Sequence, residues 1–211
     1  YIWTVSSGGT ITSGGSTTDN TVTVTWNNAG SKTVGVRYTD SDGCTSTSPS
    51  TFPVHIYPLP VPTITGLNIL CAGPTERIYT TQPGMTDYIW NVSAGGTIVA
   101  GGGLSNNTIT VTWNDPGPQT ISVIYTNANG CTAANPTEID ITVNAPPEPT
   151  ITGEVNVCAG TTGIVYATEA GMSDYVWAVS PGGTITSGGT FNDNTATVKW
   201  NTAGAQSISV N

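Results

Sequence analysis

The feature that most constrains this sequence is an internal repeat with a period of 87 residues. Two tryptophans recur at this spacing in every repeat, and the six residues are Trp3, Trp26, Trp90, Trp113, Trp177 and Trp200. Four cysteines follow the same period in two pairs, Cys44 with Cys131 and Cys71 with Cys158. A fixed period without slippage is typical of a tandem array, so the fold must be one that about 87 residues can complete.

Proline-rich segments at 57–62 and 144–149 occupy the same phase of the repeat and mark its boundaries. They predict a partial repeat at 1–61 without its first strands, a complete repeat at 62–148, and a partial repeat at 149–211 without its last strand. We expect the polypeptide to continue at both ends. Proline stiffens a linker and blocks edge pairing, so the joints favour a semi-rigid rod of domains.

Apolar residues alternate with polar ones throughout the complete repeat. In residues 108–113, Ile109, Val111 and Trp113 fall on one face, and threonines fall on the other. This period of two indicates a half-buried antiparallel strand, and no segment has apolar residues at helical spacing. Six further strands are expected at 63–70, 78–81, 88–92, 97–100, 120–126 and 138–143. Seven short strands separated by glycine and asparagine turns predict an all-β sandwich of two sheets.

The same alternation assigns the aromatic residues to the core. All six tryptophans, together with Tyr38 and Tyr125, are expected to hold each domain together from the inner faces of the strands. A sugar-binding platform is the alternative for Trp90 and Trp113, but both fall on the apolar face, which favours packing.

Charge is sparse and strongly acidic, with four Lys and Arg residues against thirteen Asp and Glu and a net charge of −9. Nucleic acids and anionic membranes attract clustered basic residues, so neither is an expected partner. No apolar run approaches the roughly 20 residues of a membrane-spanning helix, so no direct membrane insertion of this segment is expected.

The four cysteines admit three interpretations. The simplest is a disulfide between Cys71 and Cys131 within one repeat, which would stabilise it by about 4 kcal/mol on the loop-entropy estimate. The first and sixth loops of a sandwich lie at opposite ends, however, so a staple between neighbouring repeats stays open. Four reduced, buried thiols are the third possibility. No Cys-x-x-Cys motif is present, and a single histidine cannot complete a metal site with them.

Catalytic residues are not indicated. His55 is the only histidine, and it lies between Val54 and Ile56, so its side chain should face outward from a strand without a titratable partner. Asp87 and Asp174 recur in phase, one per repeat, as turn formers. We therefore expect no enzyme and no cofactor.

Calcium is the one ligand that the sequence suggests. Asp40 and Asp42 alternate with other residues before Gly43, as the ligands of a calcium loop do. The second repeat has Asn127 and Asn129 there instead, and no glutamate follows at EF-hand spacing. A glycine-containing turn is therefore favoured over a calcium site.

Several motifs resemble a known family. Val-Cys-Ala-Gly at 157–160, Gly-Met-Ser-Asp-Tyr-Val-Trp at 171–177 and Asn-Gly-Cys-Thr at 129–132 are similar to PKD-like repeats of the immunoglobulin fold. Such repeats occur in very large surface proteins of Bacteroidota, including gliding-motility adhesins of the SprB type. The resemblance covers essentially the whole chain. It implies tandem immunoglobulin-like domains, export by a type IX route and an extracellular location at the cell surface.

Taken together, the patterns predict a structural stalk in a large adhesin or filament that spaces a distal binding region from the cell. Its partners would be neighbouring repeats of the same chain. A repeat that itself binds surface polysaccharide or other cell-surface proteins is the first alternative. An accessory region of a secreted multidomain enzyme is the second.

Overall fold

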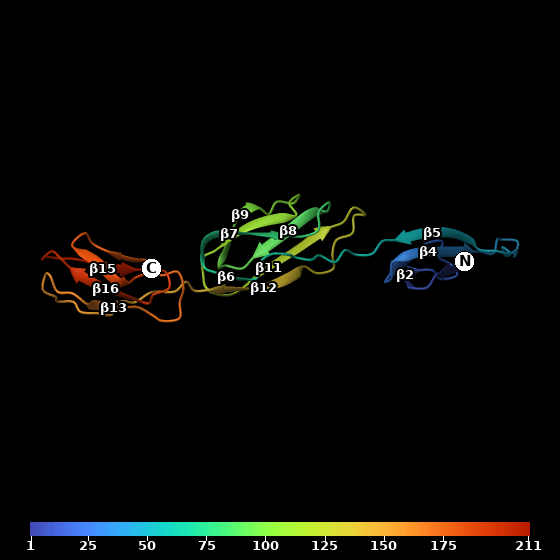
Figure 1. Cartoon of the computed structure of the whole chain (residues 1–211). Coiled ribbons are helices and arrows are strands. Elements are labelled where there is room, and N and C mark those ends of the chain that lie inside the picture. Colours follow the sequence, from blue (N-terminus) through green and yellow to red (C-terminus); the bar gives the residue numbers. More distant parts are fainter. The chain divides into compact units, whose positions relative to one another are not determined.

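The structure is a computed structural model that describes all 211 residues, and its regular elements are all strands (Figure 1). The chain forms two compact units, Tyr1–Ala145 and Pro146–Asn211. The first unit contains the partial first repeat and the complete second repeat, and the second unit contains the third repeat. The chain has no helix with the length and apolarity to span a membrane.

The second repeat is a complete sandwich of seven strands. They are β6 (Ile69–Cys71), β7 (Gly73–Thr80), β8 (Thr86–Val92), β9 (Gly96–Gly101), β10 (Thr108–Trp113), β11 (Gly117–Thr126) and β12 (Thr137–Asn144). One sheet has the order β6-β12-β11-β8, and the other has the order β7-β10-β9. All pairings are antiparallel except that of β6 with β12. The antiparallel sheet and the mixed sheet pack face to face as an immunoglobulin-like sandwich, as the alternating pattern predicts.

The two sheets enclose one apolar core. Its buried residues are Leu70, Tyr79, Tyr88, Trp90, Ile109, Val111, Trp113, Ile121, Val123, Tyr125, Ile141 and Val143. Strand β10 shows why these residues are inside: its inner side chains are buried, and its threonines alternate with them on the outer face. Burial of these aromatic and aliphatic side chains removes apolar surface from water and so stabilises the domain.

The first predicted strand of this repeat, 63–70, is divided between the two sheets. Thr65 forms an isolated bridge with Thr80 of β7, and the chain then crosses over to join β12 as β6. Gly66 lies at the crossing, where a Cβ atom would come within 2.2 Å of the Tyr79 ring. The alternation of apolar residues breaks at this glycine: Ile64 precedes it on one face, whereas Leu67 and Ile69 follow on the other. The change of sheet therefore coincides with a shift of phase in the sequence pattern.

The first repeat contributes five strands, β1 (Ile2–Val5), β2 (Gly9–Gly14), β3 (Val22–Trp26), β4 (Gly30–Arg37) and β5 (Ser50–Ile56). They form the sheets β1-β4-β5 and β2-β3. The exposed fraction of Tyr38 is 56%, against 2% for its equivalent Tyr125, so its place in a core stays a prediction for a repeat that includes the strand equivalent to β7. The second repeat covers Tyr125 with a full sandwich, whereas the β2-β3 sheet has no strand equivalent to β7. Trp3 and Trp26 are only partly buried for the same reason.

The third repeat contains β13 (Ile164–Ala167), β14 (Trp177–Val179), β15 (Gly183–Gly188), β16 (Thr195–Trp200) and β17 (Ile208–Val210). Their sheets, β13-β16-β15 and β14-β17, follow the pairing of the second repeat. Tyr166, Tyr175, Trp177, Ala196, Val198 and Trp200 are its buried core residues.

Candidate functional site

The buried tryptophans are part of a hydrogen-bonded framework inside each sandwich. In the second repeat, Trp113 Nε1 donates to the hydroxyl of Tyr79 at 3.1 Å, and that hydroxyl donates to the carbonyl of Leu67 at 2.8 Å. The two rings meet edge to face, with centroids 6.4 Å apart. Burial raises the pKa of the Tyr79 hydroxyl. The chain of bonds ties β7 and β10, two neighbouring strands of one sheet, to the first segment of the repeat.

The third repeat reproduces this framework 87 residues later. Trp200 Nε1 donates to the Tyr166 hydroxyl at 3.0 Å, and the hydroxyl donates to the Glu154 carbonyl at 2.9 Å. The ring pair keeps an edge-to-face geometry at 6.3 Å. The period in the sequence therefore corresponds to a period in specific buried contacts.

The other tryptophan of each repeat anchors a loop. Trp90 Nε1 donates to the carbonyl of Asn106 at 3.0 Å, and its equivalents Trp3 and Trp177 donate to Asp19 and Asp193 at 2.9 Å. Thus these indoles use their only polar atom inside the repeat. A surface platform for sugar rings needs aromatic faces that are open to solvent, which the buried Trp90 and Trp177 do not offer.

A tyrosine fixes the turn before each Trp strand. The hydroxyl of Tyr88 donates to the Gln82 carbonyl at 2.7 Å and accepts from the backbone N–H of Met85 at 3.0 Å. Asp87 in this turn has a φ of 54°, and its equivalent Asp174 has a φ of 61°. Aspartate tolerates this left-handed conformation better than most residues do, which explains why it recurs here.

Sequence reasoning missed a second set of structural residues. Ser93 Oγ donates to the Gln119 side chain at 2.5 Å and accepts from the Thr120 N–H at 3.0 Å, joining β8 to β11. Ser180 and Gln206 repeat the contact at 2.6 Å. In the first repeat Lys32 stands at the glutamine position and donates to the carbonyl of Ser7. The recurrence of this serine and this glutamine at a spacing of 87 residues is the sequence pattern that could have indicated the contact.

The prediction of a disulfide between Cys71 and Cys131 within one repeat is wrong, because the length of β12 separates the two thiols. Cys71 is paired with Asn144, the last residue of β12, whereas Cys131 precedes the first residue of that strand. An eight-residue strand spans roughly 23 Å. A disulfide requires Cα atoms within about 7 Å. The third interpretation, buried thiols, is wrong too, because Cys44, Cys71 and Cys158 are exposed and Cys131 is half-buried.

The suggested calcium loop forms a turn in both repeats that contain it. Asp40 Oδ1 accepts from the backbone N–H groups of Asp42 and Cys44 at 3.0 and 2.8 Å. Asn127 Oδ1 accepts from Asn129 and Cys131 in the same way, at 3.0 and 3.1 Å. No three His, Cys, Asp or Glu side chains gather in a metal-binding group. The neutral amide of Asn127 accepts the same two backbone hydrogen bonds as the carboxylate of Asp40, which supports the turn interpretation. Calcium binding stays a prediction.

One loop contacts the joint that precedes the second repeat. Asn127 Nδ2 donates to the carbonyl of Pro58 at 3.5 Å, and Thr137 Oγ1 donates to the carbonyl of Pro62 at 2.7 Å. The loop between β11 and β12 therefore lies at the end of the sandwich where the chain enters. The opposite end, at Asn144, is where the chain leaves.

In the second and third repeats, one side chain binds the first segment to the sandwich. This side chain is neutral in the second repeat and acidic in the third. In the second repeat Gln82 accepts from the Thr63 N–H at 3.1 Å and donates to Thr63 Oγ1 at 2.8 Å. Glu169 takes this place in the third repeat and accepts from Thr150 and Thr168. The bond from the Thr150 hydroxyl, followed by that from Thr168, lowers the pKa of Glu169 to about 2.

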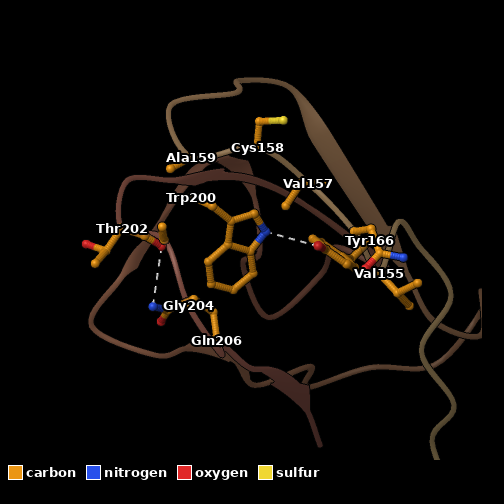
Figure 2. A pocket seen from close by; sticks show the side chains of 11 residues that line it. Val155, Val157, Cys158, Ala159, Tyr166, Trp200, Thr202, Gly204 and Gln206 are labelled. Carbon is orange, nitrogen blue, oxygen red and sulfur yellow. Dashed lines mark hydrogen bonds between the residues drawn. The ribbon is translucent and has the colours of Figure 1, made fainter.

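A cavity of about 420 Å³ lies beside Trp200 in the third repeat (Figure 2). Val157, Cys158 and Ala159 border one side, and Gly204 and Gln206 border the other. The equivalent segments in the second repeat are β6 and β11, and β12 runs between them and buries Ile141 and Val143. Since the complete repeat fills this space with its own strand, we assign no ligand to it.

The sequence profile of the PKD-like domain matches three stretches, 1–54, 57–140 and 144–211, which together cover nearly the whole chain. The chain belongs to the PKD-like domain family. The PKD-like profile starts and stops once in each repeat, in agreement with the recurring tryptophan framework. The boundaries at 61 and 148 remain predictions from the sequence. Among curated proteins, none matches this chain.

Several solved structures resemble the PKD-like chain only distantly. It is 13% identical to the Escherichia coli adhesin FdeC, with all of this chain and 79% of that one covered at a TM-score of 0.40. It is 13% identical to invasin, a bacterial integrin-binding protein, with 99% and 48% covered and a TM-score of 0.36. For domains 4 and 5 of the S-layer protein SbsC the identity is 19%, the coverage 59% and 62%, and the TM-score 0.28. The chain thus spans about half of invasin and less than two thirds of the SbsC structure.

Proposed function

We propose that this chain is a structural segment of a large extracellular adhesin or filament, in which tandem PKD-like repeats space a distal binding region from the cell. The observation that carries the proposal is the recurrence of one internal framework. The pairs Trp113–Tyr79 and Trp200–Tyr166 form the same buried contacts 87 residues apart. Polar atoms that recur in phase serve the stability of each repeat.

The resemblance to SprB-type adhesins, export by a type IX route and display at the cell surface are parts of the same proposal. They are supported by the repeat motifs and by a composition rich in Thr, Ser, Asn and Gly. A sparse, acidic charge keeps such an array soluble and discourages association between copies. A non-catalytic role is also part of the proposal, since His55 is exposed on β5 and pairs only with the ring of Tyr57, 4.7 Å away.

Single-molecule stretching of a multi-repeat protein in reducing buffer tests the stalk. A load-bearing array should unfold one repeat at a time, with each event releasing about 300 Å of chain, since an extended residue spans roughly 3.5 Å. Unfolding at negligible force, or without a regular increment, would argue against a stalk that carries load. Antibody labelling of intact cells tests the location separately, and an absence of signal from cells that contain the protein would contradict surface display.

A repeat that itself binds a partner is the second candidate, and recurring exposed apolar side chains favour it. Ile78 and its equivalent Val165 are 64% and 52% exposed, and Ile89 and its equivalent Val176 are 51% and 62% exposed. Surface polysaccharide and other cell-surface proteins are the partners to test, with a glycan array and a surface-adhesion assay. Binding that is lost in an Ile78→Ser, Ile89→Ser variant of normal stability would favour this role over the stalk.

A further inference from the structure

The complete second repeat carries one cysteine at each of its two ends. In the second repeat Cys71 ends β6 beside Asn144, and the N–H of Ala72 donates to the Asn144 carbonyl at 2.8 Å. Asn144 also ends β12, so Cys71 lies where the chain leaves the sandwich. Cys131 lies in the loop between β11 and β12, at the end where the chain enters. Both thiols are accessible, and the length of β12 keeps them apart.

The loop that carries Cys131 is held against the entering joint. Asn127 Oδ1 accepts from the N–H of Cys131 at 3.1 Å, and the N–H of Asn127 donates to the Cys131 carbonyl at 2.9 Å. The amide of the same asparagine donates to the carbonyl of Pro58 at 3.5 Å. One side chain thus connects the backbone of Cys131 to the joint.

The period of 87 residues shows which cysteine of the preceding repeat would lie near this loop in an array of complete repeats. Tyr57 follows β5 in the first repeat and is the equivalent of Asn144 in the second. Since Cys71 is paired with Asn144, the same cysteine of a preceding complete repeat would be paired with position 57. That position is adjacent to Pro58, whose carbonyl Asn127 contacts. The leaving-end cysteine of one repeat and the entering-end cysteine of the next would therefore flank the same joint.

We propose that consecutive repeats are joined by a disulfide between the Cys71 position of one repeat and the Cys131 position of the next. The two thiols lose two protons and two electrons and form one S–S bond. A disulfide-carrying oxidant accepts the electrons and is reduced to two thiols. The inference rests on the proposed function only in needing an oxidising extracellular compartment. Each joint would then be crossed by the peptide chain and by a covalent bond that resists bending and extension.

A tandem protein of two copies of residues 62–148 tests the proposal. Each copy contains a complete sandwich with its own core, between Leu70 and Val143. The junction reproduces the natural one, because residues 62–66 and 149–153 are both Pro-Thr-Ile-Thr-Gly. Three variants are made by Cys→Ser substitution. The inner variant keeps Cys71 of the first copy and Cys131 of the second. The outer variant keeps the two opposite cysteines, and the third keeps both cysteines of the first copy.

The variants are oxidised at low protein concentration with oxidised and reduced glutathione, and non-reducing peptide mass spectrometry identifies the bonds. The inner variant should form one intramolecular disulfide, seen as a mass decrease of two hydrogen atoms and loss of alkylation at both thiols. The outer and single-copy variants should remain alkylatable. Near-ultraviolet circular dichroism of the tryptophans checks that all three fold. A folded inner variant that keeps both thiols, or equal cross-linking in the outer variant, would overturn the proposal. Neither result depends on the cellular location or on the force-bearing role, so each proposal can fail without the other.

Discussion

Substitution of Tyr79 by Phe tests whether the hydrogen-bonded framework, and not apolar burial alone, stabilises the repeat. The change removes one oxygen atom and leaves the ring, which is 0% exposed. Trp113 Nε1, also in a fully buried residue, then loses the acceptor that lies 3.1 Å away. A buried donor left without a partner costs about 1–3 kcal/mol. We therefore expect the free energy of unfolding to fall by about 2 kcal/mol.

Urea denaturation of residues 62–148 measures this effect, with tryptophan fluorescence as the probe and the m-value as a check on two-state behaviour. In a domain of this size, a loss of about 2 kcal/mol corresponds to a fall in Tm of roughly 8–16 °C. Tyr125→Phe is the matched control. Tyr125 is also buried, but its hydroxyl donates to no other group of the chain, so a clearly smaller loss of stability than at Tyr79 is expected. Equal effects of the two substitutions would refute the reasoning.

Two further predictions concern a close approach and a charge. Gly96→Ala should lower the free energy of unfolding by about 1–3 kcal/mol in the same denaturation assay, because its Cβ would lie 2.7 Å from both the Trp113 ring and Val92; an unchanged midpoint would show that the core can yield. Acidification from about pH 5 to about pH 2 should release Thr150 from Glu169, since a folded-state pKa of about 2, below the ordinary 4.5, gives stability that is present above 4.5 and lost as the pH falls toward 2. Over that range, hydrogen exchange of the Thr150 amide should accelerate relative to exchange of the Thr63 amide, which donates to the uncharged Gln82. The Glu169→Gln substitution should abolish this difference. A constant ratio of the two exchange rates between about pH 5 and about pH 2 would contradict the prediction.

The period of 87 residues and the alternation of apolar residues predict most of the fold. They predicted an all-β sandwich, its seven strands and the burial of Trp90 and Trp113, because hydrophobic periodicity is a local property of the chain. They did not predict the change of sheet within 63–70, although the apolar alternation shifts phase at Gly66.

The sequence by itself determined that the chain is an array, that its units are β-sandwiches, and which residues recur in phase. Only the tertiary structure decided what those residues do. It separated Cys71 from Cys131 by the length of β12 and placed them at opposite ends of the repeat. It also gave the tryptophans their acceptors and made Asp40 and Asn127 equivalent turn residues despite their difference in charge. The physical reason is that periodicity reports which face a side chain occupies, whereas partners depend on the pairing of strands distant in sequence.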